Sequence, residues 1–188
     1  MTVKYTNRKG ETYYLKSGKT KTGKVLYNFV KNGDADGLVD LMPEGFEVTE
    51  SVNAKVNLRK VQEQAITDTE LFTVGTVLDS GSVKNNIRFE SKGESIVIYE
   101  AQLPDFSGLS LGLPKQYIQQ MEKDFLVSAR YEPVVKFELI CENTRTFLAF
   151  RMCYRGREDW MELSQGKLQQ LCEDILPHIG NESFYELI

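Results

Sequence analysis

The stretch that decides the fold runs from residue 134 to residue 163. It reads VVKFELIC (134–141), ENTR (142–145), FLAFRMCY (147–154), RGR (155–157) and DWMEL (159–163). Three apolar, β-prone runs are separated by two short turn-forming segments, which is typical of consecutive antiparallel strands. We therefore predict a three-stranded antiparallel unit here, on which the rest of its domain is built.

The residues before this unit predict a helix, a hairpin and a second helix. Thr67-Asp68-Thr69-Glu70 has the spacing of a capping box, in which Thr67 and Glu70 each bind the other's backbone amide. Residues 86–91 and 95–101 predict the two strands of a hairpin. Pro114 is expected to open a helix, because proline is favoured at helix starts. The inward face of that helix is expected to carry four apolar residues: Tyr117, Ile118, Met121 and Phe125.

The residues after the three-stranded unit predict one more helix. Ser164 is a candidate N-cap, and Pro177 is expected to end the helix. Its inward face is expected to carry Leu168, Leu171, Cys172 and Ile175. Residues 62–188 are thus expected to form an α+β domain, ordered α-β-β-α-β-β-β-α, in which an antiparallel sheet packs with about three helices.

Residues 1–61 predict a separate, small, antiparallel β-rich domain. Short β-prone runs lie between glycine- and aspartate-rich turns, and Val25, Tyr27 and Phe29 alternate with their neighbours as in a half-buried strand. The whole chain of 188 residues has apolar content sufficient for a real core, with 41% hydrophobic and 27% charged residues. A two-domain α+β protein is therefore the expected architecture.

The charge of the chain is unevenly distributed. The net charge of −4 argues against a protein that coats nucleic acid generally. Residues 1–33, however, contain eight lysines and arginines against one glutamate (+7), whereas the other 155 residues contain 15 basic against 26 acidic side chains (−11). This asymmetry predicts an anionic partner for the basic segment. Docking of the basic segment on the acidic remainder, or a solvated strand surface, are the alternatives.

Five residues of the basic segment are the candidate partner-binding residues. Lys19, Lys21 and Lys24 lie in one glycine-bounded loop, with Tyr14 and Tyr27 nearby in sequence. The preferred hypothesis is a non-enzymatic binding or adaptor protein in which this loop contacts an anionic macromolecule or another protein. The alternatives are a nucleic-acid-binding protein that uses residues 1–33, and an enzyme that uses carboxylates in a cleft between the two domains.

Two stretches come close to known ligand motifs. Residues 18–25 (GKTKTGKV) approach a phosphate-binding P-loop, but valine replaces the final serine or threonine, and the next residues alternate like a strand. Asp34, Asp36 and Asp40 occupy positions of a calcium loop, whose twelfth position is Pro43 instead of glutamate. We reject the P-loop, keep the three aspartates as a weak calcium candidate, and expect no cofactor.

The apolar loop at residues 106–113 (FSGLSLGL) is unusual because four large side chains lie on a glycine-rich backbone. A lid or a partner-binding surface is one interpretation, and a plug at one end of the sheet core is the other. The four residues are Phe106, Leu109, Leu111 and Leu113.

Few residues are available for thiol or imidazole chemistry. Three scattered cysteines and a single histidine, His178, fit neither a disulfide framework nor a zinc site. We expect three buried thiols in a reduced cytoplasmic protein, and a capping or packing role for His178. No apolar run approaches the ~20 residues of a membrane-spanning helix, and the first residues lack the apolar region of a secretory signal, so no membrane partner is expected.

Both ends of the chain resemble an uncharacterised conserved bacterial family. The resemblance rests on residues 12–24 (TYYLKSGKTKTGK), 43–47 (PEGFE) and 176–187 (LPHIGNESFYEL). No activity is known for that family, so the resemblance implies no catalytic residue. It implies a bacterial protein in a cytoplasmic setting.

Overall fold

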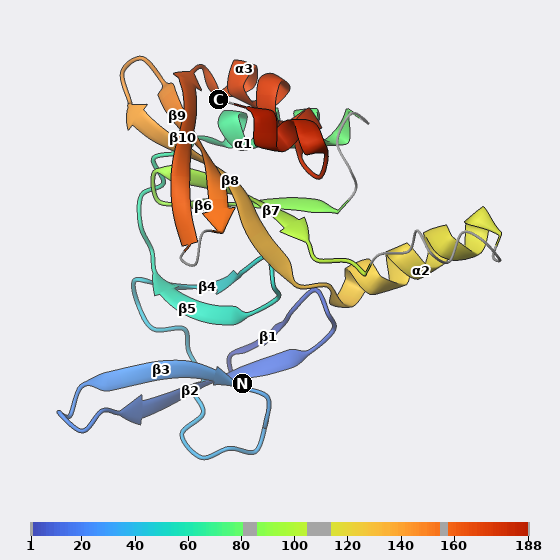
Figure 1. Ribbon diagram of the computed structural model, residues 1–188. Coiled ribbons are helices and arrows are strands. Elements are labelled where there is room, and N and C mark those ends of the chain that lie inside the picture. Colours follow the sequence, from blue (N-terminus) through green and yellow to red (C-terminus); the bar gives the residue numbers. More distant parts are fainter. Residues whose placement is uncertain (1, 81–85, 105–113, 155–157, 188) are drawn as a thin grey trace. The chain divides into compact units, whose positions relative to one another are not determined.

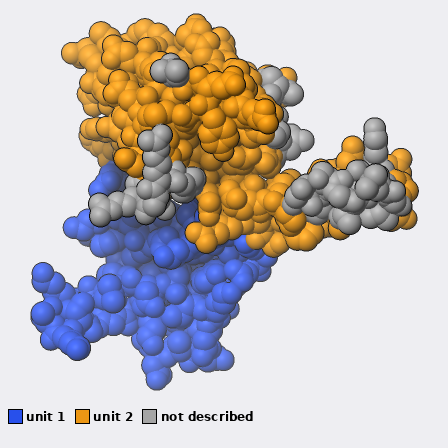
Figure 2. Space-filling view, viewed as in Figure 1, with its two compact units in different colours: residues 1–62 blue, residues 63–188 orange. Residues whose placement is uncertain are grey.

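The computed structural model describes residues 2–80, 86–104, 114–154 and 158–187. The chain divides into two compact units, Met1–Gln62 and Glu63–Ile188 (Figures 1 and 2). All strand pairs in the described ranges are antiparallel, and helices accompany the larger sheet. The α+β class predicted from the sequence is therefore confirmed. Each unit is described by itself below.

The first unit contains two small sheets. β1 (Lys4–Thr6), β2 (Thr12–Lys19) and β3 (Val25–Val30) form a sheet in the order β1-β2-β3, and β4 (Phe46–Glu50) pairs with β5 (Val56–Lys60). The buried apolar residues of the unit are Leu15, Val52, Ala54 and Val56. So small a core needs additional polar contacts to fix the unit.

Asn7 provides such contacts and is only 3% exposed. Its side-chain oxygen accepts from the backbone N–H groups of Lys9 (3.1 Å) and Glu11 (2.9 Å), which shapes the β1–β2 turn. Its amide nitrogen donates to the carbonyl of Ala54 at 2.9 Å, in the β4–β5 turn. Asn7 thus joins the two sheets of the unit, and its buried polar atoms are satisfied.

The second unit is built on a five-stranded sheet in the order β10-β9-β8-β7-β6 (Figure 1). The strands are β6 (Ile87–Lys92), β7 (Ser95–Ala101), β8 (Tyr131–Cys141), β9 (Thr146–Tyr154) and β10 (Glu158–Gly166). The three-stranded unit predicted from residues 134–163 is β8-β9-β10, and the predicted hairpin is β6-β7. The register of β10 shifts between Glu162 and Ser164.

Helices cover one face of this sheet. They are α1 (Asp68–Asp79) and α3 (Leu168–Ile175), followed by the 3₁₀ segments η2 (Leu176–His178) and η3 (Glu182–Glu186). The inward residues predicted for the last helix are buried, and they share one apolar core with Ile96, Phe137, Phe147 and other strand residues. The predicted capping box is present, since the Thr67 hydroxyl accepts from the Glu70 N–H (3.3 Å) and the Thr67 N–H donates to the Glu70 carboxylate (2.8 Å).

The predicted start of α3 is wrong. Ser164 remains in β10, opposite Ala149, and Lys167 precedes the helix as its N-cap. The strand continues because Gln165 and Gly166 still pair with β9, which outweighs the local preference of serine for a cap.

The predicted inward face of α2 (Lys115–Ser128) is also wrong. The helix starts after Pro114 as expected, but Tyr117 is 65% exposed and Phe125 is 43% exposed. The apolar core of the unit contains no described α2 residue. Helical spacing defines an apolar face but does not supply a surface that buries it.

Candidate functional site

The candidate site is the tip of the β2–β3 hairpin, residues 19–24, which we call the basic tip. The strands run in register to its base, with Gly18 opposite Leu26 and Lys19 opposite Val25. Inside the tip, the Thr20 N–H donates to the Lys24 carbonyl (2.8 Å) and the Gly23 N–H to the Thr20 carbonyl (2.9 Å). Gly23 has φ +80°, a conformation that glycine adopts without strain. The tip is a closed turn held by its own backbone.

The threonines complete this turn. The Thr20 hydroxyl accepts from the Lys24 N–H at 3.1 Å, and it lies 2.9 Å from the Thr22 hydroxyl. The threonine hydroxyls and backbone amides of the tip therefore stabilise the turn itself. The lysine side chains are exposed and are the groups that a partner would contact.

Three lysines of the tip are exposed and carry uncompensated charge. Lys19, Lys21 and Lys24 all lie at the surface, and no described carboxylate is within ion-pair distance of any of them. Some other cations of this unit are paired, as Arg59 is with Glu47 at 2.7 Å and Lys31 with Glu11 at 2.5 Å. Three ammonium groups within six residues form a local positive patch that attracts anions.

Apolar side chains flank the basic tip. Val25 is 58% exposed and Leu26 is 55% exposed, and as the first two residues of β3 they point to opposite faces of the strand. A partner at the tip would therefore meet methyl groups as well as positive charge.

The structure separates the two tyrosines that were grouped with the lysines. Tyr27 lies opposite Ser17, on the same face as Lys19, and its ring centroid is 5.9 Å from that of Phe46. Tyr14 lies opposite Val30, on the other face and five residues from Lys19, which is about 17 Å of strand. Its ring packs on Gly33, where an added Cβ would approach it to 2.9 Å. Of the two tyrosines, only Tyr27 lies near the basic tip and on the same face as Lys19.

The P-loop rejected from the sequence has no structural counterpart. Residues 18–25 connect β2 to β3, so a strand follows them where a P-loop requires a helix N-terminus.

A second charged cluster of this unit was missed by sequence reasoning. Lys31 Nζ lies 2.5 Å from a Glu11 carboxylate oxygen, and the Tyr13 hydroxyl (2.9 Å) and Asn7 amide (3.2 Å) donate to the other. These hydrogen bonds, that from Lys31 first, lower the pKa of Glu11 to about 2. Glu11 and Lys31 neutralise each other, unlike the lysines of the tip. Antiparallel pairing of β2 with β3 brings these elements together, and sequence spacing alone does not show it.

The calcium candidates Asp34, Asp36 and Asp40 are all exposed. The Asp34 N–H donates to the Asn32 side chain at 2.9 Å, as in an ordinary polar turn. The described chain contains no group of three or more acidic, cysteine or histidine residues that could hold a metal ion, so the structure does not gather these aspartates into a site.

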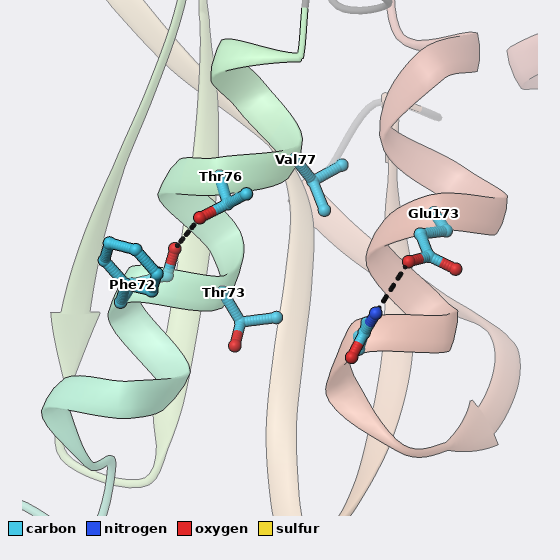
Figure 3. A pocket seen from close by; sticks show the side chains of 6 residues that line it. Phe72, Thr73, Thr76, Val77 and Glu173 are labelled. Carbon is cyan, nitrogen blue, oxygen red and sulfur yellow. Dashed lines mark hydrogen bonds between the residues drawn. The ribbon is translucent and has the colours of Figure 1, made fainter.

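A shallow hollow of about 210 Å³ lies between α1 and α3 in the second unit (Figure 3). Its polar groups are already bonded inside their own helices. Thr73 and Thr76 donate to carbonyls one turn earlier, both at 2.9 Å, and Glu173 accepts from Gln169 at 2.9 Å. Phe72 at the rim is 75% exposed. The hollow offers no paired acid and base.

The cysteines and His178 are placed as follows. Cys172 is buried, but Cys141 and Cys153 are half-buried, so the expectation of three buried thiols is wrong for two of them. Cys141 is the last residue of β8, and Cys153 is the second-to-last residue of β9. His178 Nδ1 lies 2.8 Å from the Ser183 hydroxyl, between η2 and η3. Phe106, Leu109, Leu111 and Leu113 lie outside the described residues.

Comparisons of the chain with protein-family models, with curated proteins and with solved structures found no match. Among the described helices, none has the length and apolar content needed to cross a membrane.

Proposed function

We propose that this chain is a non-enzymatic cytoplasmic binding protein that holds an anionic partner at the basic tip. The observation that carries the proposal is the exposure of Lys19, Lys21 and Lys24 with no described carboxylate in reach. Exposed Val25 and Leu26 beside them favour an acidic protein surface, since such a surface offers apolar contacts together with carboxylates.

The test is binding of fluorescent probes to the full chain over a series of salt concentrations. An acidic, leucine-containing peptide and a double-stranded oligonucleotide are compared. The triple variant K19E/K21E/K24E is expected to weaken peptide binding at least tenfold and to flatten its salt dependence. The matched control K4E/K55E/K60E removes the same charge from exposed lysines elsewhere in the same unit. Equal weakening by both variants, or no binding at low salt, would contradict the proposal.

A nucleic acid is the second candidate partner, because of the shape of the site. A two-stranded β-ribbon fits the major groove of DNA, and the β2–β3 hairpin presents its lysines at the end of such a ribbon. In this case the oligonucleotide, in duplex form, binds more tightly than the peptide. The logarithm of its affinity then falls with the logarithm of salt concentration, with a slope of about −0.9 for each phosphate contacted.

A further inference from the structure

Arg151 is a buried cation on the helix-covered face of the second unit's sheet. It is 7% exposed. It shares this face of β9 with Phe147 and Ala149, because alternate residues of a strand point the same way. Its neighbours across the sheet are Val135 in β8 and Met161 in β10. An arginine in this position is exceptional, since charged residues are rarely buried without a partner.

The contacts of Arg151 leave its charge without a counter-ion. Nη1 donates to the Phe184 carbonyl at 2.6 Å, and Nη2 lies 3.9 Å from the Met161 sulfur. The Phe184 and Tyr185 rings are each 5.8 Å from Cζ. Among the residues that the structure describes, Nε has no hydrogen-bond partner, and no carboxylate forms an ion pair with this guanidinium.

The unused donors form one edge of the guanidinium. Nε–H and the adjacent Nη2–H point side by side, in the fork geometry that binds both oxygens of a carboxylate. Nη1, on the other edge, holds the Phe184 carbonyl. Both nitrogens of this edge are therefore available to a ligand. Nε has no partner among the described residues, and Nη2 has only the 3.9 Å contact with the Met161 sulfur.

We propose that Arg151 anchors a binding site for the carboxylate of a small organic acid, beneath η3. A carboxylate on the free edge would supply both missing hydrogen bonds and the missing counter-charge. The surrounding side chains, Met161, Phe184 and Tyr185, suit an apolar body on the acid. A singly charged carboxylate is also less costly to desolvate in such surroundings than a doubly charged phosphate. Tyr185 is 73% exposed, so the cover over the guanidinium on this side is a surface side chain.

The experiment follows the arginine Nε–H signals of the full chain by NMR during titration with acetate, benzoate and inorganic phosphate at constant ionic strength. The Arg151 signal, assigned by its loss in Arg151→Met, is expected to shift with benzoate and acetate and to saturate. Arg151→Lys keeps the charge but loses the fork, so thermal stabilisation by benzoate should require roughly tenfold more ligand. Arg59→Met, which removes an arginine already paired with Glu47, should leave that stabilisation unchanged.

Two results would overturn the proposal. One is an Arg151 Nε–H signal that stays in place while the acids are added, which needs no variant beyond the assignment. The other is stronger binding of phosphate than of acetate, which would exclude a carboxylate site. These outcomes are independent of the basic tip, which lies in the other unit.

Discussion

The guanidinium of Arg145 donates hydrogen bonds to both carboxylate oxygens of Glu70, a residue 75 positions earlier in the chain. The Nε–Oε1 distance is 2.9 Å, and Nη2 bonds to Oε2. The same carboxylate completes the capping box of α1. One side chain therefore fixes both the start of a helix and the β8–β9 turn.

Replacing Glu70 by glutamine is expected to lower the free energy of unfolding by about 1–3 kcal/mol, because it breaks a charge-assisted, two-point contact and weakens the cap. Chemical denaturation measures this loss. Glu47→Gln, which breaks the half-exposed pair with Arg59, should cost less than about 1 kcal/mol. Equal losses for the two variants would show that the Arg145–Glu70 contact stabilises the fold no more than an exposed ion pair does.

The Glu70 contact also predicts acid sensitivity. Burial raises the pKa of Glu70, but the bonds from Arg145 and Thr67 lower it by more, so it lies below the ordinary 4.5. Because the folded pKa is the lower one, the stabilisation is present above pH 4.5 and is lost as the pH falls through the folded value. The stability of Glu70→Gln should fall less steeply than that of the wild type below pH 4.5. Parallel curves would contradict this.

Glu11 should titrate with a pKa of about 2 in an NMR pH titration of its carboxyl carbon. Replacing Lys31 by methionine removes the largest cause of this shift and should move the midpoint up toward 4.5. Replacing Lys24 by methionine in the basic tip is the control and should leave the midpoint in place. A midpoint that ignores Lys31 would show that the Glu11–Lys31 contact does not persist in solution.

Gly33→Ala should destabilise the first unit by roughly 1 kcal/mol, because the new Cβ would lie 2.9 Å from the outer end of the Tyr14 ring, which would have to shift. Gly18→Ala is the matched control, since a Cβ there meets nothing within 4 Å. In a strand that substitution is expected to be neutral or to stabilise by roughly 0.5–1 kcal/mol. Thermal denaturation of the two variants distinguishes packing strain from the general effect of replacing glycine.

Cys141 should react with a thiol reagent well before Cys172 in the folded chain. The hydroxyl of Thr144, followed by backbone N–H groups of the turn, lowers the pKa of Cys141, whereas burial raises that of Cys172 to about 12. Since the thiolate is the reactive form, mass spectrometry of the labelled chain should find Cys141 first. Thr144→Val should slow this labelling, and labelling of Cys172 at a comparable rate would mean that the core opens readily.

Local patterns predicted the elements of the fold well, because their causes are local. The Thr67 capping box, the strands around the 142–145 turn and the inward face of α3 each depend on residues within one or two turns of chain. The prediction of Ser164 as an N-cap was wrong because the residues adjacent to it in sequence do not reveal that it pairs with β9. The predicted inward face of α2 was wrong because burial requires a surface to pack against, and the spacing of apolar residues does not show whether such a surface exists.

For the candidate sites too, locally determined features were predicted from the sequence, and those that depend on distant segments were not. Exposure of the three tip lysines agrees with a polar, glycine-bounded loop, but the distance between Tyr14 and the tip appears only once the register of β2 and β3 is known. Arg151 gave no signal in the sequence, since an arginine among apolar strand residues reads as an exposed position. Its burial is set by η3, more than thirty residues later in the chain.

The register shift in β10 bears on which edge of the five-stranded sheet is open to pairing with another molecule's strand. Among the described strands of the five-stranded sheet, β10 and β6 are the outer ones. An outer strand offers backbone groups to another molecule's strand. The bulge between Glu162 and Ser164 interrupts that row in β10. β6 pairs with β7 without a shift and relies on its charged residues, Arg88, Glu90 and Lys92, for protection. Neutralising those three side chains should therefore promote aggregation more than any comparable change in β10.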